Sequence, residues 1–379
     1  MTHLFLIAGE PSGDKLGAAL MAGLKTLDRD IRFSGVGGPL MAAEGLESLF
    51  PMEVLSVMGL AEVLPRLPDL LRRRDHAVAA IATAAPDALI TIDSPDFCLR
   101  VAARAKAARP DLPVIHYVAP SVWAWRPARA ERMARVVDHV LALLPFEPPY
   151  MEAAGMTCDF VGHPVVAERQ ATADEIAAFR AEHDLGDAPV ALVLPGSRRG
   201  EVARLAPVFG EALAKLPDGA RVVVPTLPHL EAGLRDAARS LRGTPIVTSD
   251  PTAKRAAFGA ARAALAASGT VSLELAASDT PMVIAYDMNW FSRRILSRLL
   301  RIDTVTLVNL VSETRAVPEF LGDACRPGPV GDALERLMRL PSERERQREA
   351  LDLTMERLGR GGDAPGLRAA RSVMARLAK

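Results

Sequence analysis

The sequence has few cysteines and few aromatic residues, no excess of either charge and no long apolar run. Its three cysteines, Cys98, Cys158 and Cys325, lack zinc-ligand spacing, which argues against a zinc module and a disulfide framework. Basic and acidic residues number 46 each, so no basic excess indicates nucleic acid as a partner. No stretch has the roughly 18 apolar residues of a membrane-spanning helix, and the N-terminus lacks the regions of a signal peptide. We therefore expect a cytoplasmic protein, soluble or attached to a membrane surface.

Short apolar runs alternate with longer helical stretches along the 379 residues, which at roughly 150 residues per domain indicates two or three domains. In the first part, near-continuous apolar runs predict buried parallel strands at Leu4–Ala8, Ile31–Val36, Ala88–Ile92, Val114–Val118 and His139–Leu143. A second series predicts strands at Val190–Leu194, Arg221–Pro225, Pro245–Thr248, Ala263–Ala267 and Pro281–Tyr286. We expect an α/β protein whose two Rossmann-like, doubly wound domains, residues 1–166 and 167–345, face a central cleft. Helices at 346–379 would pack back on the first domain or on a partner subunit.

Two turns after predicted strands of the first domain carry candidate catalytic residues. Gly9–Asp14 lets a ligand approach the backbone closely and opens a helix whose N-terminus favours anions. The alternative is a tight turn in which Ser12 or Asp14 caps the helix. Asp93 directly follows another predicted strand and could take the proton of an attacking hydroxyl group. Capping, above all by Asp96, is an equally good interpretation of this acidic pair.

Two turns of the second domain predict a site for a nucleotide diphosphate. Residues 196–198 follow the first strand of that domain, where backbone N–H groups and a guanidinium would bind a leaving diphosphate. Residues 268–270 open another helix, and Glu274 one turn later could accept two hydrogen bonds from a ribose diol. Each turn could instead be a plain helix start, where Glu is also favoured. The first turn lacks a Gly-Lys-Ser/Thr ending, which disfavours an ATPase.

Two further segments suit an apolar partner. Met58–Arg74 places leucines at helical spacing before three arginines, and Pro65 and Pro68 are expected to interrupt its helix. The segment could dock on an anionic lipid surface, or it could be an amphipathic helix that faces the core. Ser121–Arg126 holds two of the three tryptophans, whose flat rings suit sugars, acyl chains or headgroups. The alternative is that one of these rings packs in the core.

Between residues 4 and about 325, an ordered series of pieces includes AGEPSGD at 8–14, IDSPDF at 92–97, SVWAWR at 121–126, LPGSR at 194–198 and SGT at 268–270. This series resembles the lipid-A-disaccharide synthase family of glycosyltransferases. The resemblance implies a GT-B fold and an inverting transfer without metal or cofactor. In that reaction, 2,3-diacylglucosamine moves from UDP-2,3-diacylglucosamine to 2,3-diacylglucosamine 1-phosphate. The products are a β-1,6-linked disaccharide 1-phosphate and UDP.

The resemblance also implies roles for individual residues. Asp93 matches the general base, and Glu10 matches a second functionally important position. The positions associated with UDP are Gly196, Ser197, Arg198, Ser268, Gly269, Thr270, Glu274 and Asn309. Acceptor or membrane contacts are expected at Ser12, Met58, Leu64, Trp123, Trp125 and Arg126. Departures that affect loop structure more than the chemistry occur at Pro11, Ser94, Cys98 and Val308.

Two other functions stay open at this point. A UDP-N-acetylglucosamine epimerase would share the fold but would need neither the tryptophan pair nor the apolar basic segment. A non-catalytic nucleotide-sugar or lipid-binding protein would bind UDP without turnover, although the intact Asp93 and Arg198 argue against it. The resemblance further implies the inner face of the bacterial inner membrane as the location, and a homodimer.

Overall fold

The computed structural model describes residues 1–55, 60–124, 128–238, 241–242, 245–287 and 303–378, with the backbone alone for 60–64. The chain forms two compact units, Met1–Ala167 with Gly361–Lys379, and Glu168–Arg360. The sequence pattern predicted the last boundary after residue 345, whereas the structure places it after residue 360. The reason is α15 (Pro341–Arg357), whose buried Gln347 exchanges two hydrogen bonds with the backbone of Met282 in the second unit.

The first unit is built on a parallel six-stranded sheet with the order β2-β1-β3-β4-β5-β6. Its strands are β1 (His3–Ala8), β2 (Arg32–Val36), β3 (Ala88–Ile92), β4 (Val114–Tyr117), β5 (His139–Ala142) and β6 (Thr157–Phe160). The five predicted strands are present, with ends shifted by at most one residue. The sequence pattern missed β6 because this edge strand alternates exposed and buried side chains instead of forming an apolar run.

Helices follow the strands of this unit: α1 (Pro11–Leu27), α2 (Pro39–Ala43), η1 (Met52–Leu55), α3 (Leu60–Ala84), α4 (Pro95–Ala108), α5 (Ala128–Met133), α6 (Pro148–Ala153) and η2 (Pro164–Ala167). The prediction that Pro65 and Pro68 interrupt a helix is wrong, since α3 runs through both. Both prolines are exposed, and later turns of α3 bury Ala77 and Ile81 in the core. This packing outweighs the hydrogen bonds that two prolines cannot donate.

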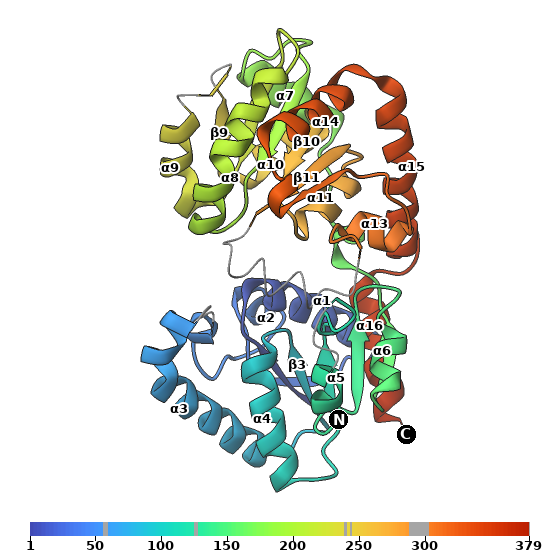
Figure 1. Cartoon of the computed structure of the whole chain (residues 1–379). Helices are drawn as coiled ribbons and strands as arrows, with labels where there is room; N and C mark the ends of the chain where they lie inside the picture. The colour runs from blue at the N-terminus through green and yellow to red at the C-terminus, as the bar shows by residue number, and fades with distance from the viewer. Residues whose placement is uncertain (56–59, 125–127, 239–240, 243–244, 288–302, 379) are drawn as a thin grey trace. The chain divides into compact units, whose positions relative to one another are not determined.

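The C-terminal helix α16 (Pro365–Leu377), red in Figure 1, belongs to the first unit and packs on α1. A Cβ on Gly366 would lie 2.4 Å from the carbonyl oxygen of Ala19, so the two helices approach too closely for a larger residue. A buried polar contact reinforces the docking, since the Ser372 hydroxyl lies 2.8 Å from Nε2 of His139 on β5. The end of the chain is therefore fixed to the first sheet.

The second unit has a parallel six-stranded sheet in the order β12-β11-β10-β7-β8-β9. Its strands are β7 (Val190–Leu194), β8 (Arg221–Pro225), β9 (Ile246–Thr248), β10 (Ala261–Ala266), β11 (Met282–Tyr286) and β12 (Glu319–Leu321). The five predicted strands are present, with ends shifted by at most two residues. The sequence pattern missed β12, which has three residues, all partly exposed, at the edge of the sheet.

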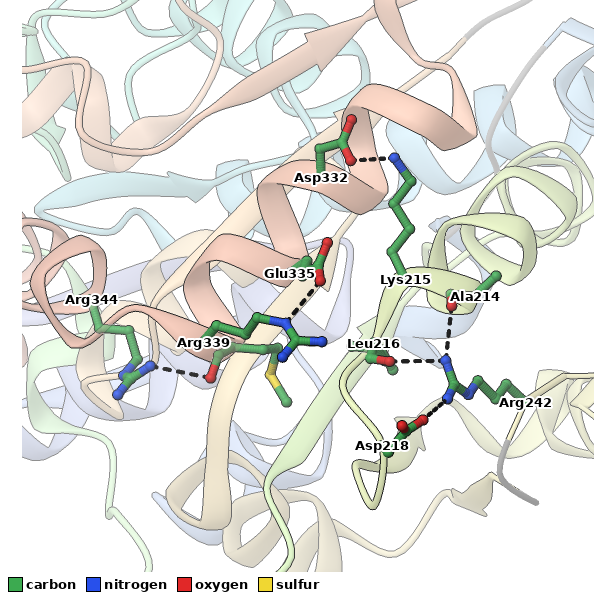
Figure 2. A network of polar contacts seen from close by, with 10 residues as sticks. Ala214, Lys215, Leu216, Asp218, Arg242, Asp332, Glu335, Arg339 and Arg344 are labelled. Atoms are coloured by element: carbon green, nitrogen blue, oxygen red, sulfur yellow. Dashed lines mark hydrogen bonds and ion pairs between the residues drawn. The ribbon is translucent and has the colours of Figure 1, made fainter.

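Within the described residues of the second unit, the helices are α7 (Ala173–Glu182), α8 (Arg199–Ala212), η3 (Leu213–Lys215), α9 (Pro228–Ala238), α10 (Pro251–Ala260), α11 (Val271–Ala277), α13 (Leu307–Ser312), η4 (Gly322–Ala324), α14 (Pro327–Arg339) and α15. Helix α14 packs against α8 and η3. Figure 2 shows the polar contacts around this packing, where Lys215 pairs with Asp332. Arg242 donates to the carbonyl oxygens of Ala214 and Leu216 at 2.8 and 2.9 Å, which ties the segment after α9 to η3.

Both sheets have a point where the chain reverses its direction of winding. In the first sheet, β2 lies on one side of β1 and β3 lies on the other. In the second sheet, β8 lies on one side of β7 and β10 lies on the other. In open parallel sheets, ligands bind outside the carboxyl ends of the strands at this switch point. The candidate ligand sites are therefore the turns after β1 and β3 in the first unit and after β7 and β10 in the second.

Candidate active site

In the first unit, the turn after β1 touches the turn after β3. A Cβ on Gly9 would lie 2.5 Å from the hydroxyl oxygen of Ser94, so a larger residue would push the turns apart. Asp93 and Ser94 have left-handed backbones, with φ of 52° and 41°. Residues other than glycine rarely adopt this conformation, and such strain clusters at functional sites. The Asp93 N–H donates to the carbonyl oxygen of Tyr117 on β4 at 2.9 Å, which fixes the strained turn.

The side chain of Asp93 is accessible at this turn. The residue is partly exposed, and the Ser12 hydroxyl donates to its Oδ2 at 3.5 Å. Cys98, early in α4, is fully buried nearby, and its burial together with the charge of Asp93 raises the pKa of the thiol. Cys98 therefore stays a neutral thiol and places no second negative charge beside the carboxylate. An accessible carboxylate in this position can accept a proton from an attacking hydroxyl group.

Glu10 lies in the same turn as Ser12 and is the N-cap residue of α1, where it is partly exposed. The alternative in which Asp14 caps α1 is wrong. Asp14 is 2% exposed, and its carboxylate accepts three backbone N–H groups at the start of α2 at 2.9 to 3.0 Å. The Asp14 carboxylate thus connects the turn after β1, which carries Glu10 and Ser12, to the start of α2 after β2.

Trp123 and Glu147 form a packed pair beyond the ends of β4 and β5. The indole Nε1–H of Trp123 donates to Glu147 Oε1 at 3.3 Å, and its ring packs edge-on against Phe146. Glu147 is 3% exposed, and burial raises its pKa to about 7, although hydrogen bonds from the Leu144 and Leu143 N–H groups and from Trp123 act in the opposite direction. Trp123 is therefore held by a carboxyl group that titrates near neutral pH. Sequence reasoning missed Glu147 because nothing local indicates its burial.

The remaining predicted residues of the first unit either make other contacts or lie outside the described residues. The Asp96 side chain is 98% exposed and pairs with Arg129, and α4 has no side-chain cap, so the capping role considered for Asp96 is wrong. Outside the described residues lie Met58, Trp125, Arg126 and the side chain of Leu64. The structure thus brings together Glu10, Ser12 and Asp93 at the first switch point.

In the second unit, a hollow of about 350 Å³ opens at the switch point. Seven of its lining residues are those predicted for UDP: Gly196, Ser197, Arg198, Ser268, Gly269, Thr270 and Glu274. Sequence reasoning missed Thr226 and Lys254, which also line the hollow and have no local signature. The Thr226 hydroxyl is buried and makes no hydrogen bond among the described residues, so it can bond to a ligand.

Charged side chains of both signs line this hollow. Arg198 Nη1 donates to Glu201 Oε1 at 3.2 Å, and Lys254 Nζ donates to Glu274 Oε2 at 2.6 Å. The Arg198 side chain is 60% exposed, so its guanidinium can reach a ligand. The hollow therefore offers cations for a diphosphate and a carboxylate, Glu274, for hydroxyl groups.

Asn309 does not line this hollow. It is 1% exposed, and its amide nitrogen donates to the carbonyl oxygen of Val317 at 2.9 Å and to Thr304 Oγ1 at 3.3 Å. Its amide oxygen accepts the Val317 N–H at 3.0 Å. Asn309 therefore stabilises the segment 304–317 from within, and a direct contact to UDP stays a prediction.

Within the described residues, no group of three or more His, Cys, Asp or Glu side chains could hold a metal ion. In the same part of the chain, no helix is long and apolar enough to cross a membrane.

Solved structures share this arrangement of strands and helices. The chain is similar to the UDP-GlcNAc 2-epimerase from Neisseria meningitidis bound to UDP-GlcNAc, with a TM-score of 0.66 and 13% identity, covering 100% of both chains. It is similar to the calicheamicin glycosyltransferase CalG4, with a TM-score of 0.58 and 19% identity, covering 100% of this chain and 98% of the other. At these identities the likeness shows the fold alone. The protein is an α/β protein of the GT-B class, as predicted.

The sequence comparisons identify the family within this class. The model of the family described as lipid-A-disaccharide synthetase matches residues 4–361. The lipid-A-disaccharide synthase of Ruegeria pomeroyi is 59% identical over 389 residues, covering 100% of this chain and 96% of the relative. The chain therefore belongs to the lipid-A-disaccharide synthetase family, and it is a glycosyltransferase of lipid A biosynthesis. The epimerase alternative is not favoured, because that likeness is one of fold at 13% identity.

Proposed function

We propose that the enzyme transfers 2,3-diacylglucosamine from UDP-2,3-diacylglucosamine to the 6-hydroxyl of 2,3-diacylglucosamine 1-phosphate, with inversion at the anomeric carbon. Membership of the family supports the use of a nucleotide sugar and of lipid substrates. One observation carries the chemistry. The switch point of the first sheet holds an accessible carboxylate, and that of the second sheet holds a hollow with cationic groups. A base for the acceptor and an anion site for the leaving group are what such a displacement requires.

In the proposed donor site, the diphosphate binds the turn at 196–198 and the guanidinium of Arg198, while the ribose diol donates to Glu274. Negative charge grows on the UDP oxygen as its bond to the anomeric carbon breaks, and Arg198 stabilises that charge. The turn at 268–270 lines the same hollow, and Asn309 supports the site through its segment. The accessible guanidinium in this hollow supports the assignment.

In the proposed acceptor site, Asp93 is the general base. It takes the proton of the 6-hydroxyl as that oxygen attacks the anomeric carbon, so the nucleophile gains charge only as the new bond forms. Ser12 orients Asp93 through the hydrogen bond at 3.5 Å, and Glu10 is a second catalytic group of the same turn. Trp123 contributes to the acceptor side, where Glu147 holds its indole.

The substrates proposed here are lipids, so we place the enzyme at the cytoplasmic face of the bacterial inner membrane. Met58, Leu64, Trp125 and Arg126 are the proposed contacts to acyl chains or to the bilayer. Arg72 on α3 pairs with Asp69 at 3.2 Å, but its side chain is 79% exposed. This exposure supports an interaction with anionic lipid, because basic side chains beside an apolar segment favour such surfaces. A homodimer is also proposed, and sedimentation of the purified full chain tests it.

The deciding experiment supplies the purified full chain with UDP-2,3-diacylglucosamine and 2,3-diacylglucosamine 1-phosphate. We expect UDP release that depends on both substrates, together with a disaccharide 1-phosphate seen by mass spectrometry. A parallel reaction with UDP-N-acetylglucosamine alone tests for epimerisation, which we expect to be absent. UDP binding without turnover of any acylated sugar would show that the proposal is wrong.

A further inference from the structure

The candidate donor site already contains a negative charge of the protein's own, the carboxylate of Glu201. This residue lies in the first turn of α8, and its side chain is 18% exposed. Glu201 Oε2 accepts the backbone N–H of Ser197 at 3.2 Å. Its Oε1 accepts from Arg198 Nη1 at 3.2 Å and from the Tyr286 hydroxyl at 3.3 Å. Two of these three donors, on Ser197 and Arg198, are the groups expected to bind a diphosphate.

The position of this carboxylate is well defined by its surroundings. A Cβ on Gly196 would lie 2.8 Å from both Cβ and Oε2 of Glu201, so the side chain lies directly against the turn. Burial and the charge of Glu201 raise the pKa of Tyr286 on β11, so its hydroxyl stays protonated and keeps donating. An anion that uses the Ser197 N–H and Nη1 of Arg198 therefore has to compete with Glu201.

We propose that Glu201 is an internal stand-in for the diphosphate, which satisfies these donors in the empty site and yields them when a nucleoside diphosphate binds. The inference rests on the proposed function, because it takes the hollow as the UDP site. Without a ligand, the carboxylate then keeps the part-buried Tyr286 hydroxyl paired, which avoids the cost of an unsatisfied donor, while it also holds the exposed donors of Ser197 and Arg198. Product UDP competes with a carboxylate that is always present, so its affinity is lowered and its release is faster.

A capping role is the competing explanation for Glu201. A glutamate in the first turn of a helix often accepts a backbone N–H just before the helix, as in a capping box. A residue with only that role would keep its place when UDP binds and would hold Arg198 ready for the ligand. The two roles predict different effects on UDP binding when the charge of Glu201 is removed. Removal of the charge tightens UDP binding if Glu201 competes, and weakens it or leaves it unchanged if Glu201 only supports the turn.

The test is the binding of UDP to Glu201→Gln, measured by isothermal titration calorimetry on the full chain. Glutamine keeps the size and one acceptor oxygen but loses the charge. If, in the wild type, the state with the Glu201 carboxylate in place outnumbers the open state by about ten to one, the Kd for UDP should be about tenfold lower in Glu201→Gln than in the wild type. The inhibition constant of UDP as a product falls with it. Raising the ionic strength reduces the difference in the Kd for UDP between the wild type and Glu201→Gln, because salt screens the repulsion between Glu201 and the diphosphate.

Glu211→Gln is the matched control, since it removes a carboxylate from an exposed position of the same helix. At about 1.5 Å per residue it lies about 15 Å further along α8, beyond the screening length of about 8–10 Å. We expect its Kd to equal that of the wild type. Equal thermal unfolding of both variants shows that the fold is intact. If the wild type binds UDP and Glu201→Gln binds it equally or more weakly, the stand-in role is wrong and the donor site stands. A wild type that does not bind UDP overturns the donor site itself.

Discussion

Replacing Glu147 by glutamine tests whether the buried carboxyl group that binds Trp123 makes the stability of the protein depend on pH. Glu147 is 3% exposed, and burial raises its pKa from 4.5 to about 7. An acid whose pKa is raised in the folded state contributes stability that is present below the unfolded pKa and is lost as the pH rises through the folded pKa. A shift of this size corresponds to about 3 kcal/mol. The wild type therefore loses about 3 kcal/mol of unfolding free energy between pH 4.5 and 7.5 that a neutral side chain does not lose.

The Glu147→Gln variant avoids this loss at high pH but has an energetic cost of its own. Its amide can accept the two N–H groups of Leu143 and Leu144, but its own N–H₂ group then faces the indole N–H of Trp123. A buried donor without an acceptor costs about 1–3 kcal/mol. The variant should thus be less stable than the wild type at pH 4.5, and the gap should close or reverse by pH 7.5.

Urea unfolding at pH 4.5, 6 and 7.5, followed by far-UV circular dichroism, measures this gap. Glu152→Gln on α6 is the matched control, because the same substitution at an exposed position leaves no buried group unpaired. Its stability should follow that of the wild type at each pH. A difference between wild type and Glu147→Gln that stays constant from pH 4.5 to 7.5 would refute the reasoning, since it would mean that the buried carboxyl group does not titrate in this range.

Three further substitutions test the catalytic base, the donor site and the docking of the last helix. Asp93→Asn should lower turnover by about 10²- to 10⁴-fold, as expected for loss of a general base, while the exposed Asp96→Asn stays within about twofold; a loss of less than tenfold for Asp93→Asn would contradict the assignment. Glu274→Gln should raise the Kd for UDP about tenfold, measured by calorimetry, because hydrogen bonds to a charged acceptor are worth about 1.5 kcal/mol or more; an unchanged Kd would remove Glu274 from the site. Gly366→Ala should lower the free energy of unfolding by about 1–3 kcal/mol, because its Cβ would lie 2.4 Å from a carbonyl oxygen of α1. Gly328→Ala, which meets nothing within 4 Å, should not do so, and equal urea midpoints for the two would show that α1 and α16 are not in close contact.

Much of the local structure followed from the sequence. Buried parallel strands are near-continuous apolar runs, and this local signal placed ten strands to within two residues. It failed at β6 and β12, because edge strands are partly exposed and carry no such run. It also failed at α3, where packing in the core overrides the cost of Pro65 and Pro68.

The candidate site was only partly accessible from the sequence. Small residues and carboxylates directly after strands marked the turns at 9–14, 93–96, 196–198 and 268–270, because such turns carry ligands in α/β proteins. Nothing in the sequence indicated that Lys254 would lie 2.6 Å from Glu274, or that Glu147 would be buried against Trp123. These pairs join residues 20 and 24 positions apart, so no local pattern records them.

The sequence by itself determined ten of the described strands, the turns that carry candidate ligand-binding groups, and the family to which the whole chain is similar. Only the tertiary structure decided the order of the strands, and with it the two switch points at which β1 meets β3 and β7 meets β10. The physical reason is one of range. Apolar periodicity and turn chemistry act over a few residues, whereas the neighbours of a strand are set by packing between segments far apart in the chain.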